Sequence, residues 1–381
     1  MSKNFSIYIV LWLLIQLLIE INCQTATLID DKLYIVDGRN FNKKFIYLDV
    51  SIPFNTQNIL WHELTTIVPE HVAAASVKGG ANNKTLFLYG GTAYNGAVMA
   101  LVYAFNTQNN SWSIPKLPEG IIMRRDNLKG IVDDKGLMYL FGGRLDGVRY
   151  NDMFILDTIN LDVKIGSSIN APSPRSLYGA ALLSNHFIIY LGGLGNDGVK
   201  ASLKKVNLYD TINNSWSTQI TSGTIPSDRY ALSAVLGLDG QRIIIFGGIG
   251  LQDSLYVLDI INYEWQLPKT TGKSPSSRRW HQANVIGKYM VISFGYDPNI
   301  ENDILLLDIS NNEEFVWTNE FELMFITTDP SPPNGTSTAG TLSISSMIGI
   351  SIGSLVGGIL LLFGGFFLYK WNKNKQLLLR A

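Results

Sequence analysis

Four times in this chain, a run of strand-forming residues ends on a pair of glycines. The runs are "LFLYGG" (86–91), "MYLFGG" (138–143), "IIYLGG" (188–193) and "IIIFGG" (243–248). Single glycines at Gly38 and Gly295 extend the series, so that successive closing glycines are 53, 52, 50, 55 and 47 residues apart. A period near 50 in a strand-rich chain is typical of a propeller array, and it constrains the fold more than any other feature of the sequence.

Each unit of the repeat has room for four short strands. In the fifth unit these are "YALSAVLGL", "RIIIFGG", "SLYVLDI" and "YEWQLP", with turn residues between them. A second marker is a Trp that follows an Asp or Asn after six residues, as in Asp259 and Trp265. The same offset joins Asp210 to Trp216, whereas in the third unit it reaches Val163. Four strands per unit predict one propeller blade each.

The glycine pair, the Asp and the Trp together resemble the kelch repeat, and the resemblance covers residues 24–323 in six units. It implies an all-β, six-bladed β-propeller that closes directly between the sixth and first units. The glycines are then expected where a strand turns beside the crowded axis, because glycine accepts positive φ and leaves room for another backbone. The Trp is expected to fill the wedge between blades. Such a fold does not by itself name a function.

Both ends of the chain carry segments that are typical of membrane targeting. Residues 1–23 combine Lys3, an apolar run and a small residue at Cys23, which predicts a cleaved signal peptide more than an uncleaved signal anchor. Residues 347–369 have no charged side chain and are long enough for a transmembrane α-helix. A glycolipid-anchor signal is the weaker alternative, because such signals end on their apolar tail.

The segments around this helix give its expected orientation. Residues 324–346 are rich in Ser, Thr and Pro and predict a solvated stalk, and residues 370–381 form a short basic tail. Positive residues gather on the cytoplasmic side of membrane helices, so the tail should face the cytoplasm. We expect a single-pass type I membrane protein, with the plasma membrane as its first location and other secretory membranes as alternatives. Gly349, Gly353 and Gly357 recur on one helix face and predict a homodimer, although glycine is also simply frequent in membrane helices.

Export is consistent with the modification signals in the sequence. The chain's one cysteine is Cys23, so the mature ectodomain should contain no disulfide. Four sequons offer candidate glycan acceptors at Asn83, Asn109, Asn213 and Asn334.

Composition and motifs argue against several function classes. Charged residues make up 16% of the chain and its formal net charge is −1, so we expect no nucleic-acid partner. "GLGNDG" (193–198) matches a dinucleotide fingerprint, but it leads into a strand instead of the required helix. Galactose oxidase, an enzyme of this fold, needs a Tyr–Cys cross-link that the mature chain cannot form. The four histidines have no ligand spacing. We therefore predict no metal, no cofactor and no enzymatic activity.

Binding residues are expected on loops that project from the blades. Units three to six begin with arginines, Arg125, Arg175, Arg229 and Arg279 or its neighbour Arg278, whose regular placement favours a structural role. Kelch domains that grip acidic peptides carry arginines two residues further on, where this chain has Asn127, Leu177, Ala231 and Trp280.

Two groups of residues remain as binding candidates. Trp280 and His281, with Arg279, form a candidate stacking platform on the rim, unless Trp280 is buried against the next blade. The loop "RLDGVRYND" (144–152) supplies Arg144, Arg149 and Tyr150, unless it is merely solvated. The sequence thus predicts a non-catalytic cell-surface receptor or adhesion module for a protein or glycan. The alternative is a membrane-anchored extracellular enzyme with a site built from propeller loops.

Overall fold

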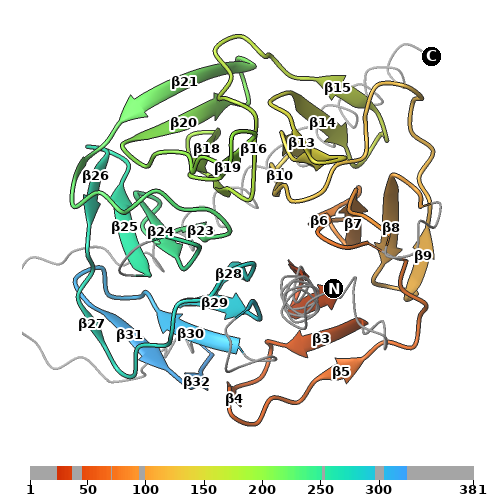
Figure 1. The fold of residues 1–381 in the computed structure, drawn as a ribbon. Coiled ribbons are helices and arrows are strands. Elements are labelled where there is room, and N and C mark those ends of the chain that lie inside the picture. The colour runs from red at the N-terminus through yellow and green to blue at the C-terminus, as the bar shows by residue number, and fades with distance from the viewer. Residues whose placement is uncertain are drawn as a thin grey trace, which may run out of the picture. The chain divides into compact units, whose positions relative to one another are not determined.

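The computed structural model describes residues 24–36, 45–69, 71–93, 99–250, 254–296 and 304–323. Within these residues the regular secondary structure consists of strands, and the six larger sheets are arranged as blades around a central axis (Figure 1). The predicted all-β, six-bladed propeller is confirmed.

Each blade has a core of four antiparallel strands, arranged from the axis outward in chain order. The first three blades are β1 (Thr25–Ile29), β2 (Lys32–Val36), β3 (Phe45–Asp49) and β5 (His62–Glu63); β6 (Ala75–Gly79), β7 (Thr85–Tyr89), β8 (Val102–Asn106) and β9 (Ser111–Ser113); and β10 (Gly130–Val132), β11 (Leu137–Phe141), β14 (Met153–Asp157) and β15 (Val163–Ile165). The last three are β17 (Gly179–Leu182), β18 (Phe187–Leu191), β20 (Lys205–Asp210) and β21 (Ser215–Ile220); β23 (Ser233–Leu236), β24 (Arg242–Phe246), β25 (Leu255–Asp259) and β26 (Glu264–Gln266); and β28 (Gln282–Ile286), β29 (Tyr289–Ser293), β30 (Ile304–Asp308) and β31 (Phe315–Thr318).

Short additional strands connect or decorate the blades. The pieces β22 (Ser222–Gly223) and β27 (Thr270–Thr271) lie parallel to the outermost strands β26 and β31 of blades 5 and 6. Two small pairs are β12 (Arg144–Leu145) with β13 (Val148–Arg149) and β16 (Arg175–Ser176) with β19 (Leu194–Gly195). A third pair, β4 (Phe54–Asn55) with β32 (Glu320–Phe321), joins blade 1 to the end of blade 6.

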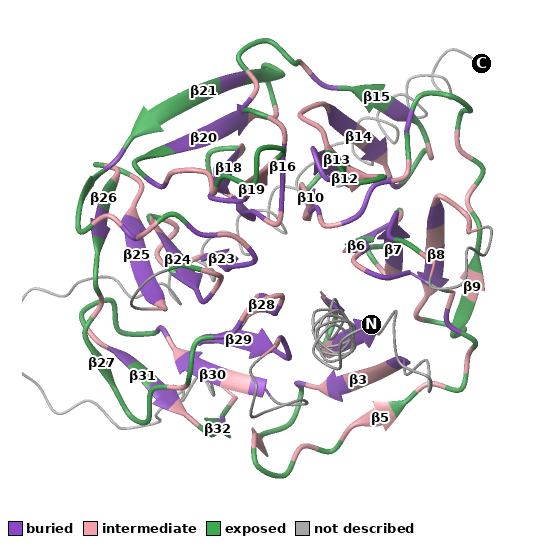
Figure 2. Cartoon of the chain, in the orientation of Figure 1, coloured by how far each residue is buried: buried purple, intermediate pink, exposed green. Residues whose placement is uncertain are grey.

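The second strand of each blade is buried almost throughout its length (Figure 2). β11, with the sequence LMYLF, and β24, with RIIIF, each bury their last four residues. A strand covered by neighbouring blades on both faces is expected to be continuously apolar, and this explains why these runs show no alternation.

The glycine pair lies where the second strand meets the next blade. A Cβ added at the first glycine (Gly90, Gly142, Gly192 or Gly247) would overlap the carbonyl oxygen of Arg125, Arg175, Arg229 or Arg278. Both glycines of each pair have positive φ, as at Gly192 (63°) and Gly193 (106°). The crowding expected at the axis therefore comes from the neighbouring blade's backbone.

The Trp side chains fill the wedges between blades, as predicted. Trp265 is fully buried and its Nε1 donates to the carbonyl oxygen of Leu203 in blade 4, at 3.1 Å. Trp317 packs on Phe246 of blade 5, with ring centroids 5.5 Å apart. Val163 stands opposite Leu156 in blade 3, where the other blades have Trp, so that departure is a real difference between blades.

Blades 6 and 1 meet directly. Gln282 in β28 donates from Nε2 to the carbonyl oxygen of Gln24, at 3.2 Å, and Trp61 of blade 1 lies 5.5 Å from the Phe294 ring of blade 6. Contacts divide the chain at Phe325 and Ile326. The predicted signal peptide (1–23), stalk (324–346), transmembrane helix (347–369) and tail (370–381) lie outside the described residues. The described part of the chain has no helix long and apolar enough to cross a bilayer.

Candidate functional site on the pocket face

Buried arginines open blades 3 to 6, and their side chains bind the backbone of their own blades. Each donates from Nη1 to a carbonyl oxygen that ends the second strand of its own blade; the pairs are Arg125 with Gly142 (2.9 Å), Arg175 with Gly192 (3.3 Å), Arg229 with Gly247 (3.2 Å) and Arg278 with Phe294 (3.1 Å). The structural role predicted for them is confirmed, and Arg278, not Arg279, is the fourth member. The corresponding residue of blade 2 is the fully buried His71, which the search for arginines did not detect.

Two residues beyond these positions, the backbone forms a series of hydrogen bonds that runs from blade 2 to blade 6. Its members are Ala73, Asn127, Leu177, Ala231 and Trp280, with φ between 56° and 59°. From Asn127 onward, each N–H donates to the carbonyl oxygen of the member before it, over 2.9, 2.8, 2.7 and 3.1 Å in turn. We call these five residues the mouth ring. Left-handed backbone is strained for residues other than Gly, Asn and Asp, and four of the five members are of other types.

The mouth ring surrounds a hollow of about 70 Å³ on the propeller axis. Below it, between the innermost strands, lies a second hollow of about 310 Å³. Because strands in a blade are antiparallel, the glycine pairs lie on the same face as the mouth ring. We call this the pocket face, and the face with the β6–β7 and β8–β9 turns the turn face.

The first candidate group borders the mouth ring. The Arg279 guanidinium lies 4.7 Å from the Trp280 ring centroid and 4.5 Å from that of Tyr296, so a cation is held between two aromatic faces. Trp280 is half-buried and lines the upper hollow.

His281 differs from the exposed platform expected of it. It is 3% exposed, and its Nε2 pairs with Ser233 Oγ at 2.8 Å. Burial, with the nearby Arg278 and Lys129 cations, lowers the pKa of His281 to about 3, so the ring is neutral. His281 follows Trp280, whose backbone is left-handed with φ of 59°, and its side chain lies inside the blade. Its part in binding stays a prediction.

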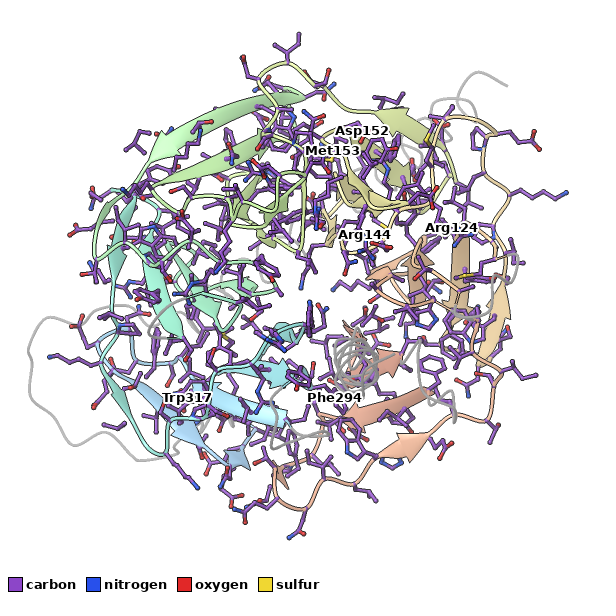
Figure 3. The ribbon with its side chains drawn as sticks, viewed as in Figure 1. Arg124, Arg144, Asp152, Met153, Phe294 and Trp317 are labelled. Atoms are coloured by element: carbon purple, nitrogen blue, oxygen red, sulfur yellow. The ribbon has the colours of Figure 1, made fainter. Side chains whose placement is uncertain are left out.

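The second candidate group lies on the same face, in the hairpin of blade 3. Arg144 pairs with Asp126, Nε to Oδ1 at 2.9 Å, next to Asn127 of the mouth ring. Figure 3 shows Arg144 on the side of blade 3 that faces the centre of the propeller. Its side chain is 41% exposed, so it keeps surface for a partner.

Arg149 and Tyr150 also have structural contacts. Arg149 donates from Nε to Ser176 Oγ (3.0 Å), and its backbone exchanges hydrogen bonds with the Asn196 side chain. The Tyr150 ring lies 3.8 Å from the Arg125 guanidinium carbon. The loop is therefore tied to blade 4 and to the blade 3 arginine, not merely solvated, and the structure brings both candidate groups onto one face.

The described residues hold no group of three or more His, Cys, Asp or Glu side chains that could share a metal ion. His62 stacks on Tyr47 with ring centroids 4.8 Å apart, while His71 and His281 are buried in the blade walls.

Comparison with known families agrees with this geometry. The model for the KLHDC2/KLHL20/DRC7 Kelch-repeats domain matches residues 23–248 and, in a second overlapping match, residues 180–353. The chain belongs to this kelch-repeat family. The two matches together span the residues that form the six blades.

Several curated kelch proteins are similar to this chain. Kelch domain-containing protein 3 of Rattus norvegicus is 26% identical over 278 residues, which is 68% of this chain and 72% of that protein. Host cell factor 2 of Homo sapiens is 28% identical over 243 residues, 58% of this chain but 30% of that protein. A Kelch repeat-containing protein of Arthroderma benhamiae is 23% identical over 379 residues, 78% of this chain and 56% of that protein.

Three sequons of this kelch domain lie on the turn face. Asn83 is in the β6–β7 turn, Asn109 in the β8–β9 turn and Asn213 in the β20–β21 turn, and all three side chains are exposed. Asn334 lies outside the described residues. The candidate glycan acceptors that can be placed are therefore at the opposite end of the blades from the mouth ring.

Proposed function

We propose that this chain is a non-catalytic binding module, anchored by a single membrane helix, that captures a protein ligand on its pocket face. The observation that carries the proposal is the grouping of Arg279, Trp280, Tyr296 and Arg144 around the mouth of the axial hollow. Trp, Tyr and Arg dominate the binding energy of protein interfaces.

The backbone of the mouth ring supports the same face. Leu177, Ala231 and Trp280 adopt left-handed φ of 59° without being Gly or Asn. Strain of this kind persists where the surrounding structure over-determines it, and it gathers at binding sites. Here the interblade hydrogen bonds hold each ring member in place and direct its side chain toward the hollow.

The membrane part of the proposal rests on the sequence. An N-terminal signal, an uncharged segment at 347–369 and a basic tail favour a type I protein at the plasma membrane. Glycans at Asn83, Asn109 and Asn213 would occupy the turn face and leave the pocket face clear. The segment with Gly349, Gly353 and Gly357 supports a homodimer through the membrane, and a helix-association reporter that shows no loss on Gly353→Ile would contradict it.

The test of topology uses the full chain expressed in secretory cells. We expect it to resist alkaline extraction from membranes and to lose mass on enzymatic deglycosylation. Single Asn83→Gln, Asn109→Gln and Asn213→Gln variants should each show which site carries a glycan. A full-length chain that stays unglycosylated and is extracted by alkali would contradict the membrane assignment.

The test of the binding face compares two variants of the full chain against arrays of purified surface proteins and of polysaccharides. Trp280→Ala should weaken saturable binding by about 30-fold, the loss expected for a hot-spot aromatic. Ile261→Ala, an exposed residue on the turn face, is the matched control and should bind as the parent does.

The two arrays distinguish a protein ligand from a glycan ligand. Saturable binding to a protein that needs Trp280 supports the proposal, and binding confined to polysaccharides would make the ligand a glycan. Binding lost in Ile261→Ala but kept in Trp280→Ala would place the site on the turn face and overturn the proposal. The alternative of an anchored enzyme has no specific observation in its favour.

A further inference from the structure

One lysine stands between the two axial hollows. Lys129 lies two residues beyond Asn127 of the mouth ring, immediately before β10, and lines both the upper hollow of about 70 Å³ and the lower one of about 310 Å³. Its place on the axis has no counterpart in the predicted binding surfaces, which lie on the rim.

The contacts of Lys129 leave most of its hydrogen-bonding capacity unused. Its Nζ donates to Gln282 Oε1 of blade 6, at 2.9 Å. The Gln282 amide is fixed in that orientation, because its Nε2 donates to the carbonyl oxygen of Gln24 at 3.2 Å. An ammonium group has three protons to donate, and the described residues provide this one side-chain partner and no carboxylate.

The lining of both hollows has one sign of charge. Among the described residues that line them, the ionised groups are Lys78 and Lys129, and neither Asp nor Glu is present. Neutral polar groups complete the lower hollow: the Thr27 and Ser76 hydroxyls, which pair with each other at 2.6 Å, and the Asn284 amide, which donates to the carbonyl oxygen of Ala26 at 3.5 Å. Thr25 Oγ1 is buried and has no hydrogen-bond partner within the described part of the chain.

A cation enclosed in a protein is costly unless an opposite charge lies beside it. Lys129 is half-buried and Lys78 is exposed, so with no acid in the lining the two lysines give the channel a field that attracts anions. We propose that the axial channel binds a small carboxylate anion at Lys129, with one oxygen on the ammonium and the other on the hydroxyl donors of the lower hollow. Trp280 of the protein-binding face also lines the upper hollow, but the anion site at Lys129 does not depend on the proposed function.

The pH dependence of anion binding tests the site without any substitution. Burial lowers the pKa of Lys129 to about 8. The other titratable groups lining the hollows near it are His281, whose pKa is about 3, and Tyr178, whose pKa burial raises far above neutrality. Lys78 opens toward solvent. Between pH 7 and pH 9, Lys129 is therefore the group whose charge changes beside the proposed anion.

The experiment is calorimetric titration of the full chain with sodium acetate at constant ionic strength, together with Lys129→Gln and Lys129→Arg. Lys78→Gln is the control for general electrostatics. We expect saturable binding to the parent, at least a tenfold loss in Lys129→Gln, retention in Lys129→Arg and a change of less than threefold in Lys78→Gln. In the parent, affinity should fall from pH 7 to pH 9.

Each other result has a defined meaning. Absence of acetate binding to the folded parent would overturn the proposal and leave Lys129 solvated by water. Equal binding in Lys129→Gln, or saturable binding of chloride with none of acetate, would overturn the assignment as well. If Lys129→Gln does not fold, a parent affinity for acetate that stays constant between pH 7 and pH 9 would be enough to reject the assignment to Lys129. Displacement of acetate by carboxymethyl dextran would show that the site takes a carboxylate carried on a larger molecule, and failure to displace it would show that the site takes a free anion.

Discussion

The backbone carbonyl of Arg229 accepts a hydrogen bond from the N–H of Gly193, at 3.0 Å, across the boundary between blades 4 and 5. The Arg229 side chain meanwhile binds the Gly247 carbonyl of its own blade at 3.2 Å. One residue thus binds two successive glycine pairs, and the same arrangement recurs at Arg125 and Arg175, while the Arg278 side chain binds the Phe294 carbonyl instead.

Gly192→Ala should destabilise the propeller strongly. The new Cβ would overlap the Arg229 carbonyl and also impose a left-handed φ on Ala. We expect a loss of roughly 2 to 4 kcal/mol in the free energy of unfolding. Gly198→Ala is the control, because Gly198 has positive φ but open space, and it should lose about 1 kcal/mol. Urea unfolding measures both, and equal losses would mean that the close approach is unimportant.

The Trp wedges should differ in strength. Trp265 is fully buried with its indole N–H bonded to Leu203, whereas Trp112 is half-buried and its Nε1 has no partner within the described residues. Trp265→Phe loses a hydrogen bond as well as volume, and we expect it to cost about 1 to 2 kcal/mol more than Trp112→Phe. Thermal unfolding of the two variants decides this, and a larger loss for Trp112→Phe would contradict the packing described.

The buried Arg125 depends on Asp152. Its guanidinium is 1% exposed and donates to both Asp152 oxygens, at 2.5 and 2.8 Å. Asp152→Ala leaves that cation unpaired and should cost about 3 kcal/mol. Asp30→Asn, which removes an exposed ion pair with Lys84 and keeps a residue that tolerates φ of 50°, should cost less than about 1 kcal/mol. Denaturant unfolding in low and high salt checks both values, and only the Asp30 pair should weaken further with salt.

Acid should destabilise the fold through His281. Its pKa of about 3 lies below the unfolded value of about 6.5, so between these values the unfolded chain binds a proton that the native protein does not. The stabilisation is complete above pH 6.5 and is lost as pH falls toward 3, by several kcal/mol in all. His281→Gln should reduce the slope of unfolding free energy between pH 4.5 and 6.5, above the range where carboxylates titrate. An unchanged slope in that window would show that His281 is not held neutral.

The sequence predicted features that repeat and missed those that depend on distant contacts. Gly pairs and Trp residues recur with a fixed period, so the blades and their wedges could be predicted. The pairing of Lys129 with Gln282 joins residues 153 positions apart, and no local pattern indicates it. His71 was missed because it replaces the arginine of the repeat, and the burial of His281 because the sequence does not show which way a side chain beside a left-handed residue points.

The mouth ring has a consequence for how such a protein can change. Its hydrogen bonds use only N–H and C=O groups, so Ala73, Asn127, Leu177, Ala231 and Trp280 form them equally well despite their different side chains. The positions that face an incoming molecule are therefore relieved of holding the blades together. A new binding specificity can arise there through single side-chain substitutions, while the backbone of the propeller stays the same.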